Sequence, residues 1–236
     1  MNLLGYNINP IYPEYPFEEI KVINTINPHS YCEAKKDTEF QNALRKADWL
    51  IPDGSGIVLA ARVIRGVSIP KIAGSDMHTR LLKIANEQSL RVFYLGSSDN
   101  TLLKIEERIH REYPNIQCAS YSPPFKPAFS KDDSERMVAA INQFKPDILF
   151  VGMTAPKQEK WVQTHKDKIN ANVICSVGAV FDFYAGTQNR APEWMLQLGL
   201  EWLHRLVLNP KRLWKRNFIS TPIFLKDVFR EKLLNK

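Results

Sequence analysis

The pattern of apolar and polar residues alternates between strand-like and helix-like segments along most of the chain. Short apolar runs typical of strands occupy residues 20–26, 48–51, 90–96, 115–121, 147–151 and 173–177. Amphipathic stretches lie between them, such as residues 130–142, where Met137, Val138 and Ile141 share one helical face. Strands that alternate with helices predict a doubly wound, mostly parallel α/β sheet of about five to seven strands, with helices on both faces.

Polar loops rich in glycine follow several of these runs. In an open parallel sheet, the loops at the carboxyl ends of the strands line the ligand crevice, so we expect the chemistry there. Residues 52–56 read Pro-Asp-Gly-Ser-Gly before an apolar helical stretch. Gly54 and Gly56 permit a ligand to approach helix amides, and Asp53 is interpreted either as a helix cap or as a general base. Gly96 opens a similar small polar loop, which is weak evidence for a diphosphate site.

A cluster of polar residues begins the helix that follows residues 147–151. Lys157, Gln158 and Glu159 stand in its first turn. Amides at a helix N-terminus suit anionic oxygens, so these three residues are candidates for substrate binding. The alternative is an ordinary first turn in contact with solvent.

Two further strand ends carry candidate residues. Thr25 and Asn27 close the first strand before Pro28, and they either face the crevice or cap the next helix. Asp182 follows the strand at 173–177 and either binds a sugar hydroxyl or pairs with Arg190. Both choices stay open on local chemistry.

Composition and charge indicate one core and a basic tail. The chain has 236 residues, and 44% of them are hydrophobic, which suffices for one well-buried core. Its formal charge is +7. Residues 192–236 hold nine Lys and Arg against four Asp and Glu, so most of the excess charge lies there. We therefore expect a core over residues 1–191 and a C-terminal appendage over residues 192–236. Basic residues interleaved with large apolar ones favour an anionic membrane surface, and a helix packed on the core is the alternative. Nucleic acid is not expected, because no binding motif accompanies the charge.

The remaining motifs argue against a metal or a covalent intermediate. The three cysteines and five histidines lack metal-ligand spacing, and no DxD pair or Ser/His/Asp grouping stands out. No cofactor is therefore expected. A signal peptide and a long apolar run are not evident in the sequence, so a cytoplasmic protein is expected.

Several motifs together resemble one enzyme family. They are PDGSGIV at 52–58, KIAGSD at 71–76, APKQEKW at 155–161, VGAVFDFYAG at 177–186, RAPEW at 190–194, and GLEWLHRL with NPKRLWKR within 199–216. This order resembles the WecG/TagA/CpsF glycosyltransferases, glycosyltransferase family 26, from about residue 25 to residue 216. The resemblance implies an inverting, metal-independent enzyme with a Rossmann-like core. Such an enzyme moves a sugar from a UDP-sugar to a polyprenyl-diphosphate-linked saccharide, at the inner face of the cell membrane, in bacterial polysaccharide biosynthesis.

The resemblance also assigns roles to residues of the core. Asp53 corresponds to the catalytic base, Thr25 and Asn27 to a pair in the cleft beside it, and Gln158 to a glutamine that contacts substrate. Lys71 replaces an arginine that many members carry, which keeps the charge and loses the bidentate fork.

In the appendage, the resemblance implies arginines that hold a diphosphate. Arg205 and Arg212 match two of them, and a third falls at Lys215 or Arg216. The appendage would thereby complete the active site and dock on the membrane.

Two other classes stay open on sequence alone. One is a non-catalytic module that binds a membrane surface. The other is a different nucleotide-sugar enzyme, but no GxGxxG fingerprint is evident in the sequence to support it. The donor sugar also stays open among N-acetylmannosamine, its uronic acid, glucuronic acid and other hexoses. A homo-oligomer is neither indicated nor excluded.

Overall fold

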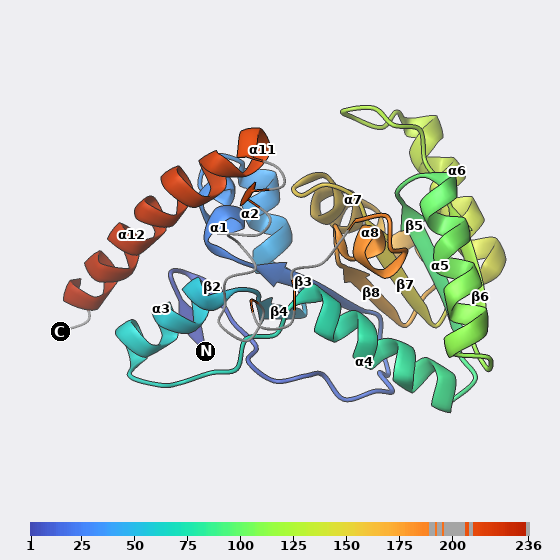
Figure 1. Ribbon diagram of the computed structural model, residues 1–236, viewed down its shortest axis with the longest axis horizontal. Coiled ribbons are helices and arrows are strands. Elements are labelled where there is room, and N and C mark those ends of the chain that lie inside the picture. The colour runs from blue at the N-terminus through green and yellow to red at the C-terminus, as the bar shows by residue number, and fades with distance from the viewer. Residues whose placement is uncertain (189–191, 193–194, 196–205, 208–209, 235–236) are drawn as a thin grey trace.

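A computed structural model describes residues 1–188, 192, 195, 206–207 and 210–234, with the side chains of 211–213 left out (Figure 1). The fold is α/β, as predicted. Six parallel strands form one sheet in the order β4-β3-β8-β7-β5-β6. Their bounds are β3 (Lys21–Ile26), β4 (Trp49–Pro52), β5 (Arg91–Gly96), β6 (Gln117–Tyr121), β7 (Ile148–Gly152) and β8 (Val173–Ser176). A two-stranded antiparallel hairpin, β1 (Asn2–Leu3) and β2 (Tyr6–Asn7), precedes them.

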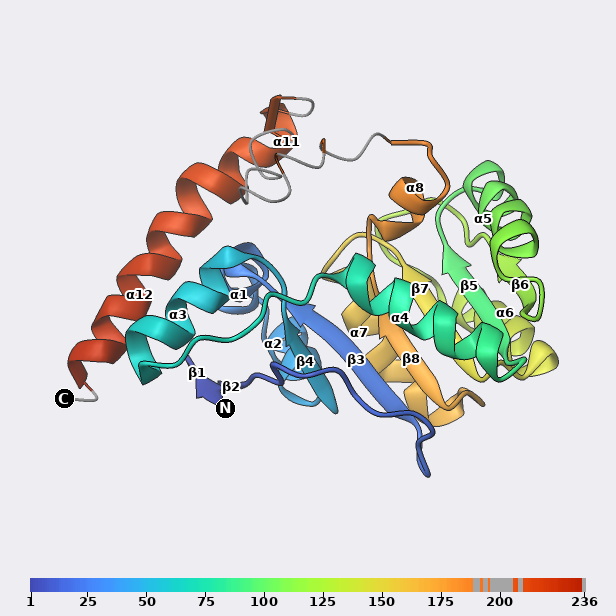
Figure 2. The same ribbon diagram turned by 60° about the horizontal axis from the view of Figure 1, so that its bottom comes forward.

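Helices cover both faces of the sheet because successive side chains of its inner strands point to opposite faces. Tyr94 and Phe150 belong to the apolar cluster beneath α4 (Gly74–Glu87), α5 (Asp99–Glu112) and α8 (Val180–Tyr184). Phe93 and Leu149, their chain neighbours, belong to the opposite cluster beneath α6 (Lys131–Phe144) and α7 (Lys157–His165), which a 3-10 turn (Lys166–Lys168) extends. The doubly wound, Rossmann-like arrangement is thereby confirmed (Figure 2).

The strand order reverses between the neighbouring parallel strands β5 and β7. The chain leaves β5 toward β6 on one side and leaves β7 toward β8 on the other, which makes their carboxyl ends a topological switch point. The two strands end in register at Gly96 and Gly152. Gly96 has φ +119°, and a Cβ there would lie 2.5 Å from the Gly152 carbonyl oxygen. Only glycine therefore permits this close approach.

The chain ends in a helical segment that packs on the first helices. It comprises α11 (Pro210–Lys215), a π-helical turn η2 (Arg216–Ser220) and α12 (Thr221–Leu234). Phe224 and Val228 of α12 are fully buried in a third apolar cluster, together with residues of α1 (Pro28–Ala34), α2 (Thr38–Arg45) and α3 (Ser55–Arg65). Figures 1 and 2 both show α12 lying beside α1 and α3. This segment is thus helical, as predicted, and its inner face is part of the core.

Candidate active site

The carboxyl ends of β3 and β4 bring Asn27 and Asp53 to one edge of the sheet. Ile26 and Pro52, the last residues of the two strands, are in register, and Thr25 pairs with Ile51. The Asp53 backbone N–H donates to the Ile26 carbonyl at 2.9 Å. Two loops that are far apart in the sequence therefore meet, and Asp53 at this edge is half-buried rather than turned into the interior.

Asp53 does not occupy the capping position of α3. The N-cap is Gly54, which has φ +92° and no side chain to offer the helix amides. Gly56 has a packing role, since a Cβ there would lie 2.4 Å from Pro28 Cγ and 3.6 Å from the Phe224 ring. This geometry does not support Asp53 as the helix cap, and its role as the general base stays a prediction.

Asn27 is the N-cap of α1. Its side-chain oxygen accepts hydrogen bonds from the backbone N–H groups of His29 (3.1 Å) and Ser30 (3.0 Å), and Ser30 Oγ accepts from the Asn27 N–H at 2.8 Å. This reciprocal capping fixes the amide plane of Asn27 next to the Asp53 loop. The predicted cap is therefore confirmed for Asn27, and its contact with substrate stays a prediction.

Lys71 lies at the same edge of the sheet. It is exposed, and the next residue, Ile72, donates its N–H to the Pro52 carbonyl at 3.0 Å. A cation thus lies beside the end of β4, and Asp53 is the residue that follows this strand.

The C-terminal segment reaches this edge through η2. His29 Nδ1 lies 2.9 Å from Ser220 Oγ, and the Cys32 thiol contacts the Ser220 carbonyl at 3.2 Å. Burial lowers the pKa of His29, and the positive charge of Arg216 lowers it further. Arg216 stands four residues before Ser220, at the start of η2, and η2 packs on α1. Sequence reasoning missed His29 and Ser220, because neither stands in a motif.

The other cations predicted for the appendage are described only in part. Lys215 is the last residue of α11 and is exposed. Arg190 and Arg205 lie outside the described residues, and so does the side chain of Arg212. Their roles stay predictions.

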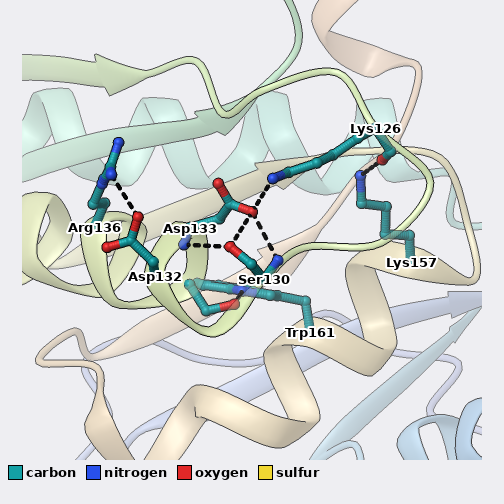
Figure 3. A network of polar contacts seen from close by, with 8 residues as sticks. Lys126, Ser130, Asp132, Asp133, Arg136, Lys157 and Trp161 are labelled. Atoms are coloured by element: carbon teal, nitrogen blue, oxygen red, sulfur yellow. Dashed lines mark hydrogen bonds and ion pairs between the residues drawn. The ribbon is translucent and has the colours of Figure 1, made fainter.

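Lys157 contacts the loop between β6 and α6. Its ammonium donates to the Lys126 carbonyl at 2.5 Å and lies 3.6 Å from the centre of the Phe129 ring. Lys126 in turn pairs with Asp133, and this cation, together with Ser130, lowers the Asp133 pKa to about 2. Figure 3 shows Lys157 turned toward the loop between β6 and α6. In this structure Lys157 therefore contacts the loop between β6 and α6, and its contact with substrate stays a prediction.

Gln158 and Glu159 are also not in contact with solvent. Both are only 3% exposed. Gln158 Oε1 accepts from the Met153 N–H at 3.1 Å, and Gln158 Nε2 donates to Glu159 Oε1 at 2.9 Å. Burial raises the Glu159 pKa to about 7. A charged residue in a first turn normally indicates exposure, so no sequence pattern marks this buried pair.

Asp182 closes the loop that follows α8. Its carbonyl accepts from the backbone N–H groups of Thr187 (3.0 Å) and Gln188 (3.2 Å), and its carboxylate accepts from the Gln188 side chain at 3.5 Å. Asp182 is half-buried. The predicted pairing with Arg190 falls outside the described residues.

A metal centre is not indicated in the described part of the chain. No group of three or more His, Cys, Asp or Glu residues in it is placed to hold a metal ion. A hollow of about 400 Å³ lies instead against the flank of the sheet, between α6 and the strands β5 and β6. Among the described helices, none has both the length and the apolar content that crossing a membrane requires.

Comparison with known proteins agrees with this geometry. The chain matches the model of the glycosyl transferase WecG/TagA/CpsF family over residues 1–236. It is 34% identical to a protein of Bacillus subtilis (strain 168) over 211 residues, which cover 89% of this chain and 80% of the relative. Relatives in Bacillus spizizenii (32%, covering 89% of this chain and 79% of the relative) and Staphylococcus aureus (30%, covering 89% and 80%) are similar over 210 residues. All three relatives are named N-acetylglucosaminyldiphosphoundecaprenol N-acetyl-beta-D-mannosaminyltransferase.

Proposed function

Because this chain belongs to the WecG/TagA/CpsF family of glycosyl transferases, we propose that it transfers N-acetylmannosamine from UDP to a saccharide on polyprenyl diphosphate. The predicted family and the predicted glycosyltransferase class are confirmed, so a non-catalytic module is no longer a competing interpretation. The names of the relatives support N-acetylmannosamine among the hexoses that the sequence left open. They also support N-acetylglucosaminyl diphosphoundecaprenol as the acceptor in cell-surface polysaccharide synthesis.

The observation that carries the proposal is the meeting of three segments at the carboxyl ends of β3 and β4. Asp53 follows β4, Asn27 follows β3, and Arg216 comes from the C-terminal segment. A base, a polar group of fixed orientation and a cation are the parts that glycosyl transfer from a nucleotide needs.

In the proposed reaction, Asp53 accepts the proton of the acceptor hydroxyl while that oxygen attacks the anomeric carbon. The new carbon–oxygen bond forms opposite the bond to the UDP oxygen, which breaks with its electron pair on UDP, so the configuration inverts. The proton remains on Asp53 until water removes it. Asn27, and Thr25 two residues earlier in the chain, would orient the acceptor beside the base.

The diphosphate that leaves gains negative charge in this step, and cations must stabilise it. Arg216, Lys215 and Lys71 are the described candidates, and Arg205 and Arg212 are the candidates outside the described side chains. The amides of the first turn of α3, next to Gly54, can add to this stabilisation. We propose that these groups suffice without a metal ion or another cofactor.

The same segment supports a place at the membrane. Its outward side exposes large apolar residues, among them Trp214, Phe218, Ile219, Ile223 and Phe229. Lys215, Lys226, Arg230 and Lys232 stand on the same segment. We propose that this side rests on the anionic inner surface of the cell membrane, where each basic residue contributes about 1 kcal/mol.

The test is UDP release from UDP-N-acetylmannosamine with a short-chain polyprenyl-diphosphate N-acetylglucosamine as the acceptor. Asp53→Asn should lower kcat by about 10²-fold to 10⁴-fold, because the amide cannot take the proton. Asp132→Asn, a change on the exposed face of α6, is the matched control and should leave kcat unchanged. If Asp53→Asn kept the full kcat, the assignment of the base would be wrong, and if the unmodified chain released no UDP, the proposed function would be wrong.

A further inference from the structure

The amide of Gln158 is held in one orientation by two partners. The Met153 N–H, which can only donate, faces Oε1, and Glu159 Oε1 accepts from Nε2. Turning the amide over would place the NH₂ group against the Met153 N–H and the Gln158 oxygen against the Glu159 oxygen. The carboxamide nitrogen carries two hydrogens, and the bond to Glu159 uses one of them.

This amide lies between two turns at the carboxyl edge of the sheet. A Cβ at Gly178, in the turn after β8, would lie 3.8 Å from both amide atoms of Gln158 and 3.7 Å from the Met153 carbonyl. Strands β7 and β8 are neighbours, and β8 also pairs with β3, which leads to Asn27. Gln158 therefore occupies a central place at the edge where Asp53 and Asn27 lie.

Glu159 lacks the partner that a buried structural carboxylate normally has. Within the described part of the chain, Glu159 Oε2 is buried without a hydrogen-bond partner, and no cation forms an ion pair with this residue. Burial raises its pKa to about 7, and its hydrogen bond with Gln158 offsets part of the increase. An ionised carboxylate buried without a cation is destabilising, so packing alone does not account for it.

The charged and titratable groups around α7 are engaged elsewhere. On α7 itself, Lys157 donates to the Lys126 carbonyl. Toward α2, Lys160 of α7 pairs with Asp37, the N-cap of that helix, and with Glu39. His165 Nδ1 lies 2.8 Å from the Trp161 carbonyl. On β8, which also contacts α7, the Cys175 thiol is buried with a raised pKa. A change in the charge of Glu159 therefore acts mainly on its hydrogen bond with Gln158.

We propose that Glu159 is a positioning residue, which holds the Gln158 amide so that its second N–H donates to an oxygen of the bound UDP-sugar. This rests on the proposed function. An ionised carboxylate holds an N–H roughly twice as strongly as a neutral acid does. Ionisation of Glu159 therefore fixes the amide more firmly, and transfer becomes faster as the pH rises through the neutral range.

The link between the two residues is tested by NMR on the full chain without substrate. The side-chain ¹⁵N–¹H signals of Gln158, assigned through bonds from its backbone signals, are followed from about pH 5.5 to about pH 8.5. They should titrate with a midpoint near 7 in the unmodified chain and in the control Glu107→Gln, which changes an exposed residue of α5. In Glu159→Gln the titration should disappear. The measurement on the unmodified chain needs no variant to fold, and Gln158 signals that did not move, or that moved equally in Glu159→Gln, would overturn the proposal.

The consequence for transfer is tested by the pH profile of kcat. Glu159→Gln resembles the neutral acid, so its kcat should equal that of the unmodified chain at acid pH and lack the rise through pH 7. A rise that persisted unchanged in a folded Glu159→Gln would also overturn the proposal. If the unmodified chain transferred no sugar at all, the proposed function would fail, while the NMR titration would still decide whether Glu159 controls the Gln158 amide.

Discussion

At the scale of single residues, Gly96 determines how closely β5 and β7 approach each other, and Gly66, the C-cap of α3, is its control. Gly96 and Gly66 both have positive φ, at +119° and +73°, but their surroundings differ. A Cβ at Gly96 would lie 2.5 Å from the Gly152 carbonyl oxygen, whereas nothing lies within 4 Å of a Cβ at Gly66. An alanine at Gly66 would therefore have only backbone strain, whereas an alanine at Gly96 would have backbone strain and a steric conflict.

We expect Gly66→Ala to lower the free energy of unfolding by about 1 kcal/mol, from backbone strain alone. Gly96→Ala adds a conflict with backbone in the centre of the sheet, so it should lower that free energy by about 3 kcal/mol or more. Urea unfolding of both variants measures the difference. Equal losses in the two variants would contradict the close approach of β5 and β7.

At the scale of elements, the docking of α12 connects the C-terminal segment to the site. Phe224 is fully buried, and Asp227 accepts hydrogen bonds from Tyr31 Oη of α1 (3.0 Å) and from Nζ of Lys35, the C-cap of α1 (2.6 Å). Because α1 begins at the Asn27 cap and η2 precedes α12, loosening α12 should move Arg216 away from the edge of the sheet. The position of the helix is thereby a condition for activity under the proposed function.

Phe224→Ala should therefore weaken α12 docking, since Phe to Ala in a core typically removes about 3 to 5 kcal/mol. Amide hydrogen exchange should become faster in α12 and α1 and stay slow in β7, and kcat/KM should fall by at least about tenfold. Phe229→Ala, on the exposed side of the same helix, is the control and should change neither in buffer with a water-soluble acceptor. Full activity in a Phe224→Ala variant with fast exchange in α12 would show that the segment does not serve the site.

The elements also show what could be predicted from sequence. All six runs became strands. An inner strand such as β7 is buried on both faces and is therefore apolar throughout, whereas the edge strand β6 is partly exposed and contains polar residues. The order of the strands and the contact of Gly56 with Phe224 join residues far apart in the chain, and no local pattern encodes them. Asp53 was found because a motif marks it. The burial of Glu159 and the loop contact of Lys157 depend on neighbours that only the fold supplies.

At the scale of the whole molecule, one side of α12 packs on the core and the other is exposed. One side packs Phe224 and Val228 in the core, and the other exposes Ile223 and Phe229 among basic residues, next to the exposed Phe218 of η2. An apolar surface of this kind beside cations is typical of a helix that lies in a membrane interface. Because the proposed acceptor is attached to a lipid, a docked α12 would bring the edge with Asp53 to its substrate.

The double variant Phe218→Ser/Phe229→Ser should therefore bind vesicles that contain anionic lipid at least about tenfold more weakly, since each buried Phe contributes about 1.5 to 3 kcal/mol. Leu103→Ser removes a comparably exposed apolar side chain from α5 and should bind like the unmodified chain. Binding by the unmodified chain should also decrease with added salt and with a lower fraction of anionic lipid, because the basic residues of the segment act through charge. Sedimentation with vesicles measures all three effects. Equal binding of the double variant and Leu103→Ser would mean that the exposed side of α12 meets another partner, such as a second copy of the chain, which the molar mass in solution would then reveal.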